Sequence, residues 1–517
     1  MELAGYDEIR SQLKGYVSPP RAQLLWGAEN LGNGVYQARL QRKELVITPG
    51  CNSPNALVEA GTHLLVACEA GDPLVEVTAS NLAFAYGASY FVFEQMPQQE
   101  HRAWVEKLYA LGAGGDVTAQ LADVAARARA WFDGHDLGRF KAILFVTGGF
   151  PWGIAFPEVP TTHMYQYPDF GRSVVAGLWA SQSPARGARN ALLIEPALVQ
   201  SGEIDAIVKA LNKNRTLTRL LPHRAATISR VQHMMDFLPQ DVIVISSHAG
   251  DARGSRVTYQ YEDDDGRQRT LVVDQTHSIG YDRAEDKLPV TEFTRFVSLD
   301  GVSWDDDVAK LALPVGTAIT AWSKLDMLDR AKHVIAEEDI SRVASSMAML
   351  LHDGPWLFIS HSFHPAAAPL VLSNCCWSWH EIGLRMMFAG ARGYVGALFP
   401  VTDVEAQEVG RALFSGKPGE PTFKSLWRAQ RQVYGNSPRR PYAVLGLPSV
   451  YIPLNPVNSP AYLHEAYRKG IDHWSTAAER YAEEELKENA QRISNFLAED
   501  FDLFKRAISG LHAAGRR

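Results

Sequence analysis

The stretch that decides the fold is LVLSNCCWSW, residues 370–379. Its first half is an apolar run typical of a buried strand, and a helical pattern follows directly after Cys375 and Cys376. A thiol at the carboxyl-terminal tip of a strand lies where α/β folds place reacting groups. The N–H groups at the start of a following helix favour thiolate over thiol, so this position suits a nucleophile.

A second apolar run ends in the same way, but in histidine. It is VIVISSHAG, residues 242–250, and His248 follows its apolar part. Neighbouring parallel strands bring their carboxyl-terminal tips to one edge of a sheet, so thiol and imidazole are expected to meet there. A thiol activated by an adjacent imidazole is the pairing that cysteine proteases use. The two runs therefore predict a cysteine–histidine dyad.

Strand and helix patterns alternate around these two runs. Apolar, strand-like runs lie at residues 142–146, 191–196, 219–221, 242–246, 356–360, 370–374, 394–398 and 442–445. Helical patterns lie at residues 204–212, 228–237 and 404–413, and from the two cysteines to Ala389. Continuous apolar strands separated by helices predict an α/β fold with a mostly parallel sheet and helices on both faces.

The pattern differs at both ends of the chain and in one long interruption. The first hundred residues contain short β-like runs at 44–48, 64–68 and 89–93, and helical periodicity follows over 101–133. Within residues 251–345, two alternating runs flank an acidic turn at 262–266, which predicts a β-hairpin. After residue 456 the composition becomes helical and charged, with an apolar stripe.

We therefore expect four parts. Residues 1–100 form an N-terminal α/β region of unknown role, and residues 101–185 a first, non-catalytic part of the main fold. Residues 186–456 form the catalytic domain, and residues 457–517 form a C-terminal helical cap. An alternative for the last part is a helix pair that binds a partner or an activator.

Composition limits the compartment and the partners. A chain of 517 residues is too long for one ordinary core, and its net charge of −7 offers no basic surface for nucleic acid or an anionic membrane. Four cysteines are too few for a disulfide framework and fit a reducing compartment. The first residues lack the apolar core of a secretory signal, and no apolar run approaches the ~20 residues of a membrane helix. We expect a cytoplasmic protein without direct nucleic-acid or membrane contacts.

The order of these parts resembles the CHAT peptidases, which are caspase-like cysteine proteases of the clan of separase and the gingipains. The resemblance covers about residues 140–455. It begins at ILFVTGGF (143–150) and IAFP (154–157), continues through the histidine and cysteine strands to FAGARGYVGALFPV (388–401), and ends in WRAQ (427–430) and YAVLGLP (442–448). It implies a caspase-like fold and peptide-bond hydrolysis through an acyl-thioester, without a cofactor or metal.

The resemblance also assigns the site. The family pattern of Asn or Ser, a small residue, Cys, any residue, then Ser or Thr is satisfied by residues 374–378 when Cys376 is the nucleophile. With Cys375 as nucleophile, a tryptophan stands where Ser or Thr is expected. His248 then acts as general base and acid. Backbone N–H groups around Ala249 and Gly250, together with that of the nucleophile, form the oxyanion hole.

The resemblance further implies a protein substrate. In bacteria, such proteases cleave a specific partner, a gasdermin-like protein or another effector encoded nearby, in antiphage defence or programmed cell death. An activator protein is part of the same expectation. The chain lacks the tetratricopeptide repeats of many relatives, so its means of regulation stays open.

Other interpretations compete with the protease. The family usually has glycine directly after the histidine, and Ala249 in its place is the one hint of an inactive pseudoprotease that binds a partner. His361 and His364, with the two cysteines and His380, form a possible metal cluster, but adjacent cysteines match no usual zinc spacing. His380 as the base lies too near Cys376 in sequence, and we expect it to pack instead.

Two further motifs have weaker functional interpretations. The glycine-rich residues 111–116 follow a helix and not a strand, so they predict a loop and not a nucleotide site. The acidic turn at residues 262–265, with Asp300 and residues 305–307, either selects a basic residue at the cleaved bond or forms a solvated surface, and the second is the commoner outcome.

Overall fold

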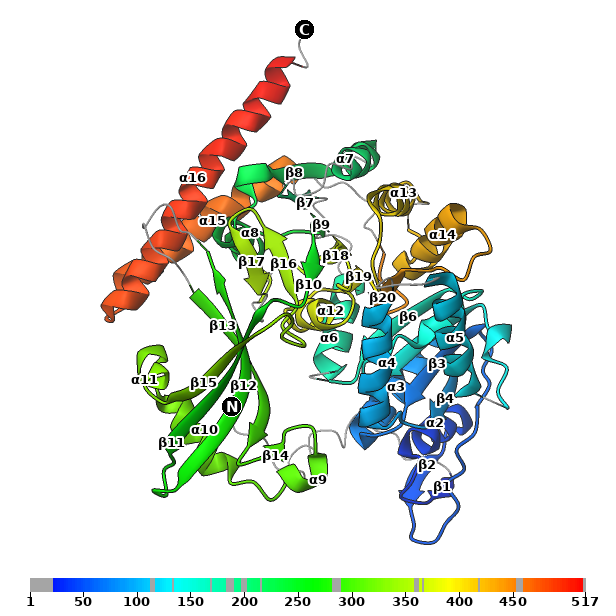
Figure 1. Ribbon diagram of the computed structural model, residues 1–517. Coiled ribbons are helices and arrows are strands. Elements are labelled where there is room, and N and C mark those ends of the chain that lie inside the picture. Colours follow the sequence, from blue (N-terminus) through cyan, green and yellow to red (C-terminus); the bar gives the residue numbers. More distant parts are fainter. Residues whose placement is uncertain are drawn as a thin grey trace. The chain divides into compact units, whose positions relative to one another are not determined.

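The computed structural model of the chain describes residues 22–111, 117–132, 134–167, 170–182, 190–196, 202–213, 216–280, 290–357, 362–364, 367–416, 419–451 and 459–514. The described residues form two compact units (Figure 1). Unit 1 comprises Met1–Val105 and Asp123–Gly171. Unit 2 comprises Glu106–Ala122 and Arg172–Arg517.

Unit 1 contains a parallel sheet. Its strands are β3 (Leu64–Glu69), β4 (Ser89–Phe93), β5 (Ala142–Thr147) and β6 (Thr161–Tyr165), in the order β4-β3-β5-β6. Helix α3 (Pro73–Tyr86) connects β3 to β4; it starts at the Asp72 cap, which accepts from the Leu74 N–H, and ends at Gly87 with φ 59°. The sheet joins strands from both sides of residue 100, since β3 pairs with β4 and β5.

Smaller elements complete the first third of the chain. They are β1 (Gln23–Trp26), α2 (Leu31–Gln41), β2 (Glu44–Ile47), α4 (Gln98–Ala110), α5 (Val117–Ala130) and the 3₁₀ turns Leu137–Arg139 and Trp152–Ala155. The three β-like runs predicted at 44–48, 64–68 and 89–93 are strands β2, β3 and β4. The helical periodicity of 101–133 is divided between α4 and α5, and residues 112–116 between them lie outside the described residues.

Unit 2 contains the larger sheet, and it confirms the predicted mostly parallel α/β class. Its strands are β7 (Asn190–Glu195), β8 (Leu217–Pro222), β9 (Val242–Ser246), β18 (Leu370–Asn374), β19 (Gly393–Ala397) and β20 (Tyr442–Gly446). Their order is β20-β19-β18-β9-β7-β8. All neighbours are parallel except β20, which runs antiparallel to β19. Strands β9 and β18 are buried along their whole length, as their continuous apolar runs predict.

Helices cover this sheet on two sides. They are α6 (Phe170–Gln182), α7 (Glu203–Lys213), α8 (Ile228–Phe237), α12 (Glu381–Phe388), α13 (Asp403–Phe414) and α14 (Thr422–Tyr434). Figure 1 shows α7, α13 and α14 on one side of the sheet and α6, α8 and α12 on the other. Helix α13 starts with a capping box, in which Thr402 and Glu405 satisfy each other's backbone N–H groups.

The predicted strand at 356–360 does not join the parallel sheet. Strand β17 (Gly354–Leu357) pairs antiparallel with β16 (Ala348–Leu351), and β16 pairs with the two-residue strand β10 (Ala249–Gly250). Residues 358–360 lie outside the described residues. A two-residue turn joins β16 to β17, so local hairpin pairing is available to this run, and an apolar pattern alone cannot distinguish it from a sheet strand.

The interruption between residues 251 and 345 has its own core. Strands β11 (Gly254–Glu262) and β12 (Gln268–Ile279) form the predicted hairpin, and the sheet order is β14-β13-β12-β11-β15. The other elements are β13 (Val290–Leu299), β14 (Val302–Ser303), α9 (Asp307–Lys310), α10 (Val315–Lys324), α11 (Met327–Ala331) and β15 (Val334–Ile340). Residues of the sheet and α10, among them Tyr261, Leu271 and Trp322, form one buried apolar cluster.

The chain ends in two long helices, α15 (Ser459–Arg480) and α16 (Glu484–Ala514), as the helical composition predicts. They pack on α8 and β8: Trp474 contacts Phe237 edge to face, and Asp500 accepts from Arg219 at 2.8 Å. Within the described part of the chain, no helix combines the length and apolar character needed to cross a membrane.

Candidate active site

The predicted dyad residues follow the tips of adjacent strands. In the parallel pairing of β9 with β18, Ser246 lies opposite Asn374. His248 and Cys376 each follow two residues later, so both lie at the same edge of the sheet on strands about 4.8 Å apart. His248 is exposed, and Cys376 is partly exposed. The structure thus brings the two predicted residues to one edge.

The two cysteines differ in their surroundings. Cys375 is completely buried, and its Sγ lies 4.0 Å from the carbonyl oxygen of Ile245 in β9. The Cys376 Sγ lies 3.9 Å from the carbonyl oxygen of Val401. Burial raises the pKa of the Cys375 thiol to about 12. Of the two, only Cys376 is accessible from solvent, and it therefore agrees better with a nucleophile.

The helix that was expected directly after the cysteines starts later. Residues 375–380 form a turn, in which Trp377 has φ +53°, and α12 begins only at Glu381. The thiol of Cys376 therefore lies beside the residues that lead into α13, not at the start of α12. Burial raises the pKa of Cys376, and the charges of Asp403 and Glu405 raise it further. The expected stabilisation of thiolate by a following helix is absent, because tertiary contacts hold residues 375–380 as a turn.

Strand β19 anchors this turn. The Ser378 Oγ donates to the Ser373 carbonyl at 3.3 Å and accepts from the Ala397 N–H at 3.2 Å. The Trp379 N–H donates to the Ala397 carbonyl at 3.0 Å, and the Tyr394 hydroxyl donates to the Ser378 carbonyl at 2.8 Å. These buried bonds hold the backbone on the carboxyl-terminal side of Cys376, which is what a positioned nucleophile requires.

The two site loops also contact each other. A Cβ atom placed on Gly250 would lie 3.9 Å from the Trp377 ring, so this ring lies next to Gly250. The Tyr109 ring stacks on the Trp377 ring, with the two ring centroids 6.2 Å apart and an interplanar angle of 27°. Trp377 follows Cys376, and Gly250 is two residues after His248. Sequence reasoning missed both aromatic side chains, because nothing in the local pattern links residue 109 to residue 377.

The backbone geometry distinguishes the two predicted oxyanion donors. Ala249 lies opposite Met349 and Gly250 opposite Ala348, and the Leu350 N–H donates to the His248 carbonyl at 2.9 Å. Hydrogen-bonded and non-hydrogen-bonded pairs alternate along an antiparallel ladder. The Gly250 N–H is therefore directed at β16, whereas the Ala249 N–H is directed away from it. Ala249 is thus the better placed donor, and a side chain at this position does not remove that N–H.

A buried carboxyl group lies at the tips of β9 and β18, next to the predicted dyad residues. Glu203, the first residue of α7, is only 2% exposed. Its Oε2 accepts from the Ser246 hydroxyl at 2.8 Å, and its Oε1 accepts from the Asn374 amide. Burial raises the pKa of Glu203 to about 7, although both hydrogen bonds act in the opposite direction. The sequence indicated Glu203 only as a helix start; its role could not be inferred from a local pattern.

A second buried carboxylate follows the histidine loop. Asp251 accepts from Arg342 Nε at 2.7 Å and from the Met347 N–H at 3.1 Å. Arg342 also donates to Glu106 at 2.6 Å, and its guanidinium lies 4.9 Å from the centre of the Tyr109 ring. These contacts connect the loop after His248 with the segment that carries Tyr109.

The acidic residues considered for substrate selection already have basic partners. Asp263 and Asp300 both accept from Arg269, at 2.6 and 2.8 Å, and Asp264 accepts from Lys324. Asp305 pairs with Arg295 at 3.3 Å. These carboxylates lie in the turns of the sheet β14-β13-β12-β11-β15. Asp263 is buried and the other three are exposed, and their bonds to the protein's own basic side chains do not favour a site for a basic substrate residue.

The remaining alternatives acquire no support. Among the described residues, no group of three or more His, Cys, Asp or Glu side chains is arranged to hold a metal ion. His361 and the glycine-rich residues 112–116 lie outside the described residues. His380 is buried, with its ring 5.6 Å from that of Tyr109, which agrees with the expected packing role.

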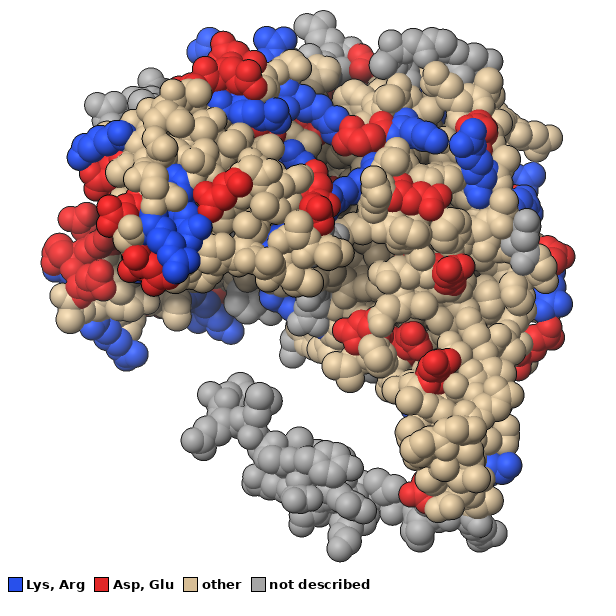
Figure 2. All heavy atoms as spheres, turned by 60° about the horizontal axis from the view of Figure 1, so that its bottom comes forward, with Lys and Arg blue, Asp and Glu red and all other residues tan. Residues whose placement is uncertain are grey.

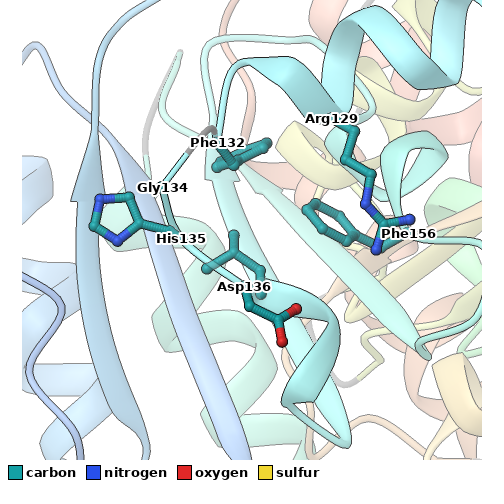
Figure 3. Close-up of a pocket in the computed structure, with 7 residues that line it drawn as sticks. Arg129, Phe132, Gly134, His135, Asp136 and Phe156 are labelled. Carbon is teal, nitrogen blue, oxygen red and sulfur yellow. The ribbon is translucent and has the colours of Figure 1, made fainter.

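Unit 1 has a cavity of about 440 Å³ (Figure 3). It is lined by Arg129, Phe132, Gly134, His135, Asp136, Leu137 and Phe156. The Arg129 guanidinium pairs with Glu158 at 2.5 Å and lies over the Phe156 ring. The charge of Arg129 is therefore already neutralised by Glu158, and the lining of this cavity includes no thiol.

Basic and acidic side chains are interspersed on the face shown in Figure 2, in keeping with the slightly acidic net charge.

Comparison with known proteins adds no assignment. No protein-family model matches the sequence, and no curated protein is significantly similar to it. What the site can do must therefore be argued from its own geometry.

Proposed function

We propose that this protein is a cysteine endopeptidase with a caspase-like fold, in which Cys376 is the nucleophile and His248 the general base and acid. The observation that carries the proposal is the register of β9 and β18, which brings both residues to one sheet edge while leaving only Cys376 of the two cysteines accessible. The resemblance to the CHAT peptidases supports the same assignment.

The reaction follows from the positions of these groups. Because burial raises the pKa of Cys376, the thiol is the resting form, and His248 takes its proton as sulfur attacks the substrate carbonyl. The N–H groups of Ala249 and Cys376 stabilise the negative oxygen of the tetrahedral intermediate. His248 then protonates the leaving amine. In the second half of the reaction His248 takes a proton from water, which attacks the acyl-thioester, and returns that proton to the Cys376 sulfur as it leaves.

We propose a specific protein partner as the substrate, and cytoplasmic cleavage of a gasdermin-like or other effector in bacterial defence or programmed cell death as the setting. This part rests on the family resemblance alone. An activator protein fits the same setting, because the raised pKa of Cys376 keeps resting reactivity low.

A pseudoprotease that binds a partner at the same site is the second candidate. The observation that favours it is Ala249 directly after the histidine, and the burial that raises the pKa of both thiols agrees with it. It predicts the same fold and partner, without a covalent step.

The deciding experiment exposes the full chain to a panel of peptidyl acyloxymethyl ketones and co-expresses it with proteins encoded nearby. We expect labelling and cleavage that Cys376→Ala and His248→Ala abolish and that Cys375→Ala retains. Cys51→Ala is the control, because Cys51 is a partly exposed thiol of unit 1. A wild-type chain that neither labels nor cleaves supports the pseudoprotease, and a dead Cys375→Ala variant beside an active Cys376→Ala variant reassigns the nucleophile.

A further inference from the structure

The tips of β9 and β18 share one buried acceptor. Ser246 and Asn374 are the last residues of the two strands and lie opposite each other. Both donate to Glu203, one to each carboxyl oxygen. Each donor precedes a dyad residue by two positions.

The surroundings of Glu203 exclude solvent from its hydrogen bonds with Ser246 and Asn374. Ser246 and Asn374 are each only 6% exposed. Helix α13 covers this group of three side chains. The Asn374 amide also donates to the Ala406 carbonyl at 3.4 Å, and a Cβ atom placed on Gly410 would lie 3.4 Å from the nitrogen of that amide. Gly410 also lets α13 approach Ile207 of α7, where the added Cβ would lie at 2.9 Å. Buried hydrogen bonds to a carboxylate are stronger than exposed ones, so this group stiffens the edge.

We propose that Glu203 is a positioning residue for the Cys376–His248 pair, because its carboxyl group holds the tips of β9 and β18 in register through Ser246 and Asn374. It contacts neither the substrate nor the reacting atoms. This inference rests on the proposed function for its consequence in catalysis, although the contacts themselves do not.

Ionisation of Glu203 changes this connection. The carboxylate accepts from both Ser246 and Asn374, whereas the protonated acid donates from one oxygen to the Ser246 hydroxyl and still accepts from the Asn374 NH2 group on the other, so ionisation reverses one of the two hydrogen bonds. Among the described residues, four titratable groups interact with Glu203: Glu195, the last residue of β7; Asp403 at the start of α13; Cys375; and the Tyr442 phenol of β20. Both carboxylates oppose ionisation of Glu203. The register is therefore sensitive to pH near neutrality.

The test measures two rates on the folded full chain as a function of pH. The first is alkylation of Cys376 by iodoacetamide, followed by peptide mass spectrometry, and it needs no peptidase activity. The second is labelling by the peptidyl ketone. The variants are Glu203→Gln, which keeps the shape and resembles the neutral acid, and Glu203→Ala, which removes both acceptors. The matched control is Glu69→Gln, because Glu69 of unit 1 is equally buried and accepts from the Gly148 N–H at 2.8 Å.

We expect Glu203→Ala to lower peptidyl-ketone labelling by about tenfold or more, since displacements of about 1 Å cost up to 10²-fold. In the wild type, we expect both rates to change in a step near neutral pH, where Glu203 ionises. Glu203→Gln is expected to keep labelling within about threefold at neutral pH and to lose this step in both profiles. Glu69→Gln should keep the wild-type profiles. Wild-type rates and profiles in both folded Glu203 variants overturn the inference.

Two further outcomes stay informative. If Glu203→Ala does not fold, Ser246→Ala and Asn374→Ala each remove one of the two hydrogen bonds, and unchanged alkylation in both overturns the inference. If the wild type is not labelled by any peptidyl ketone, the proposed function fails. The iodoacetamide profile of Glu203→Gln then still decides the inference: a profile equal to the wild type overturns it, and a lost step supports it.

Discussion

Asn374, the last residue of β18, lies opposite Ser246, the last residue of β9, and both donate to the buried carboxyl group of Glu203. The proposed dyad residues Cys376 and His248 follow this pair by two positions each. A parallel register, set by two fully buried strands, thus places the predicted thiol and imidazole at one edge, and a third residue from a preceding helix ties that edge together.

The accessibility of the cysteines predicts an order of modification. In the folded chain, iodoacetamide should modify Cys51 and Cys376. The fully buried Cys375 and Cys68 should react at least about 100-fold more slowly, because their reaction requires local opening of the structure. Mass spectrometry of digests over time measures each rate, and concentrated guanidinium should abolish the difference. If Cys375 reacts as fast as Cys376 in the folded chain, the assignment of the nucleophile is wrong.

The charge of Asp403 predicts a change in thiol reactivity. Burial is the largest cause that raises the pKa of Cys376, and Asp403 adds to it from the exposed start of α13. Asp403→Asn should therefore lower the midpoint of the alkylation profile and increase the rate at neutral pH by about twofold, an effect that salt weakens. Asp472→Asn, at the exposed ion pair with Arg468, is the control and should change nothing. An unshifted midpoint in Asp403→Asn contradicts this account.

The pKa of Glu203 predicts how stability depends on pH. Burial raises this pKa from its ordinary 4.5 to about 7. The unfolded chain therefore loses its proton first, so this contribution to stability is complete below about pH 4.5 and is lost as pH rises to about 7. The shift corresponds to at most about 3 kcal/mol.

Urea unfolding at several pH values measures this contribution. Asp236, whose pKa burial also raises to about 7, adds a slope of the same sign, so the comparison is between wild type and Glu203→Gln. The variant should lose less stability than the wild type between about pH 5 and about pH 8. Equal slopes in the two proteins show that Glu203 does not titrate in this range.

The attachment of the C-terminal helices predicts a large effect at one position. The Asp500 carboxylate, only 3% exposed, accepts from Arg219 at 2.8 Å, from Arg230 at 3.2 Å and from the Tyr467 hydroxyl. Asp500→Ala removes the buried carboxylate that two partly buried arginines share and should cost about 3 kcal/mol of unfolding free energy. Urea denaturation checks this, and Asp502→Ala at the exposed pair with Lys505 should leave the midpoint unchanged. A midpoint of wild-type value in Asp500→Ala contradicts the prediction.

The sequence by itself determined the elements whose patterns are local. The continuous apolar runs of β9 and β18 identify buried parallel strands, because a strand covered on both faces needs apolar side chains at every position. The acidic turn between β11 and β12 identifies a hairpin, and the apolar stripe after residue 456 identifies α15 and α16, because hairpins and amphipathic helices are encoded by neighbouring residues. The order of the two runs was also enough to nominate the cysteine pair and His248, and the family resemblance nominated Cys376 of the two cysteines.

Only the tertiary structure decided the surroundings of that pair. The turn at residues 375–380 replaces the expected helix start because β19 holds it through Ser378 and Trp379. The run that includes Trp356 pairs with β16 in a hairpin and not with the parallel sheet, because β16 is its neighbour in the sequence. Glu203 lies 43 residues from Ser246 and 171 from Asn374, and no local pattern connects positions so far apart. Long-range packing, and not local preference, determines which polar group is buried next to the predicted dyad residues.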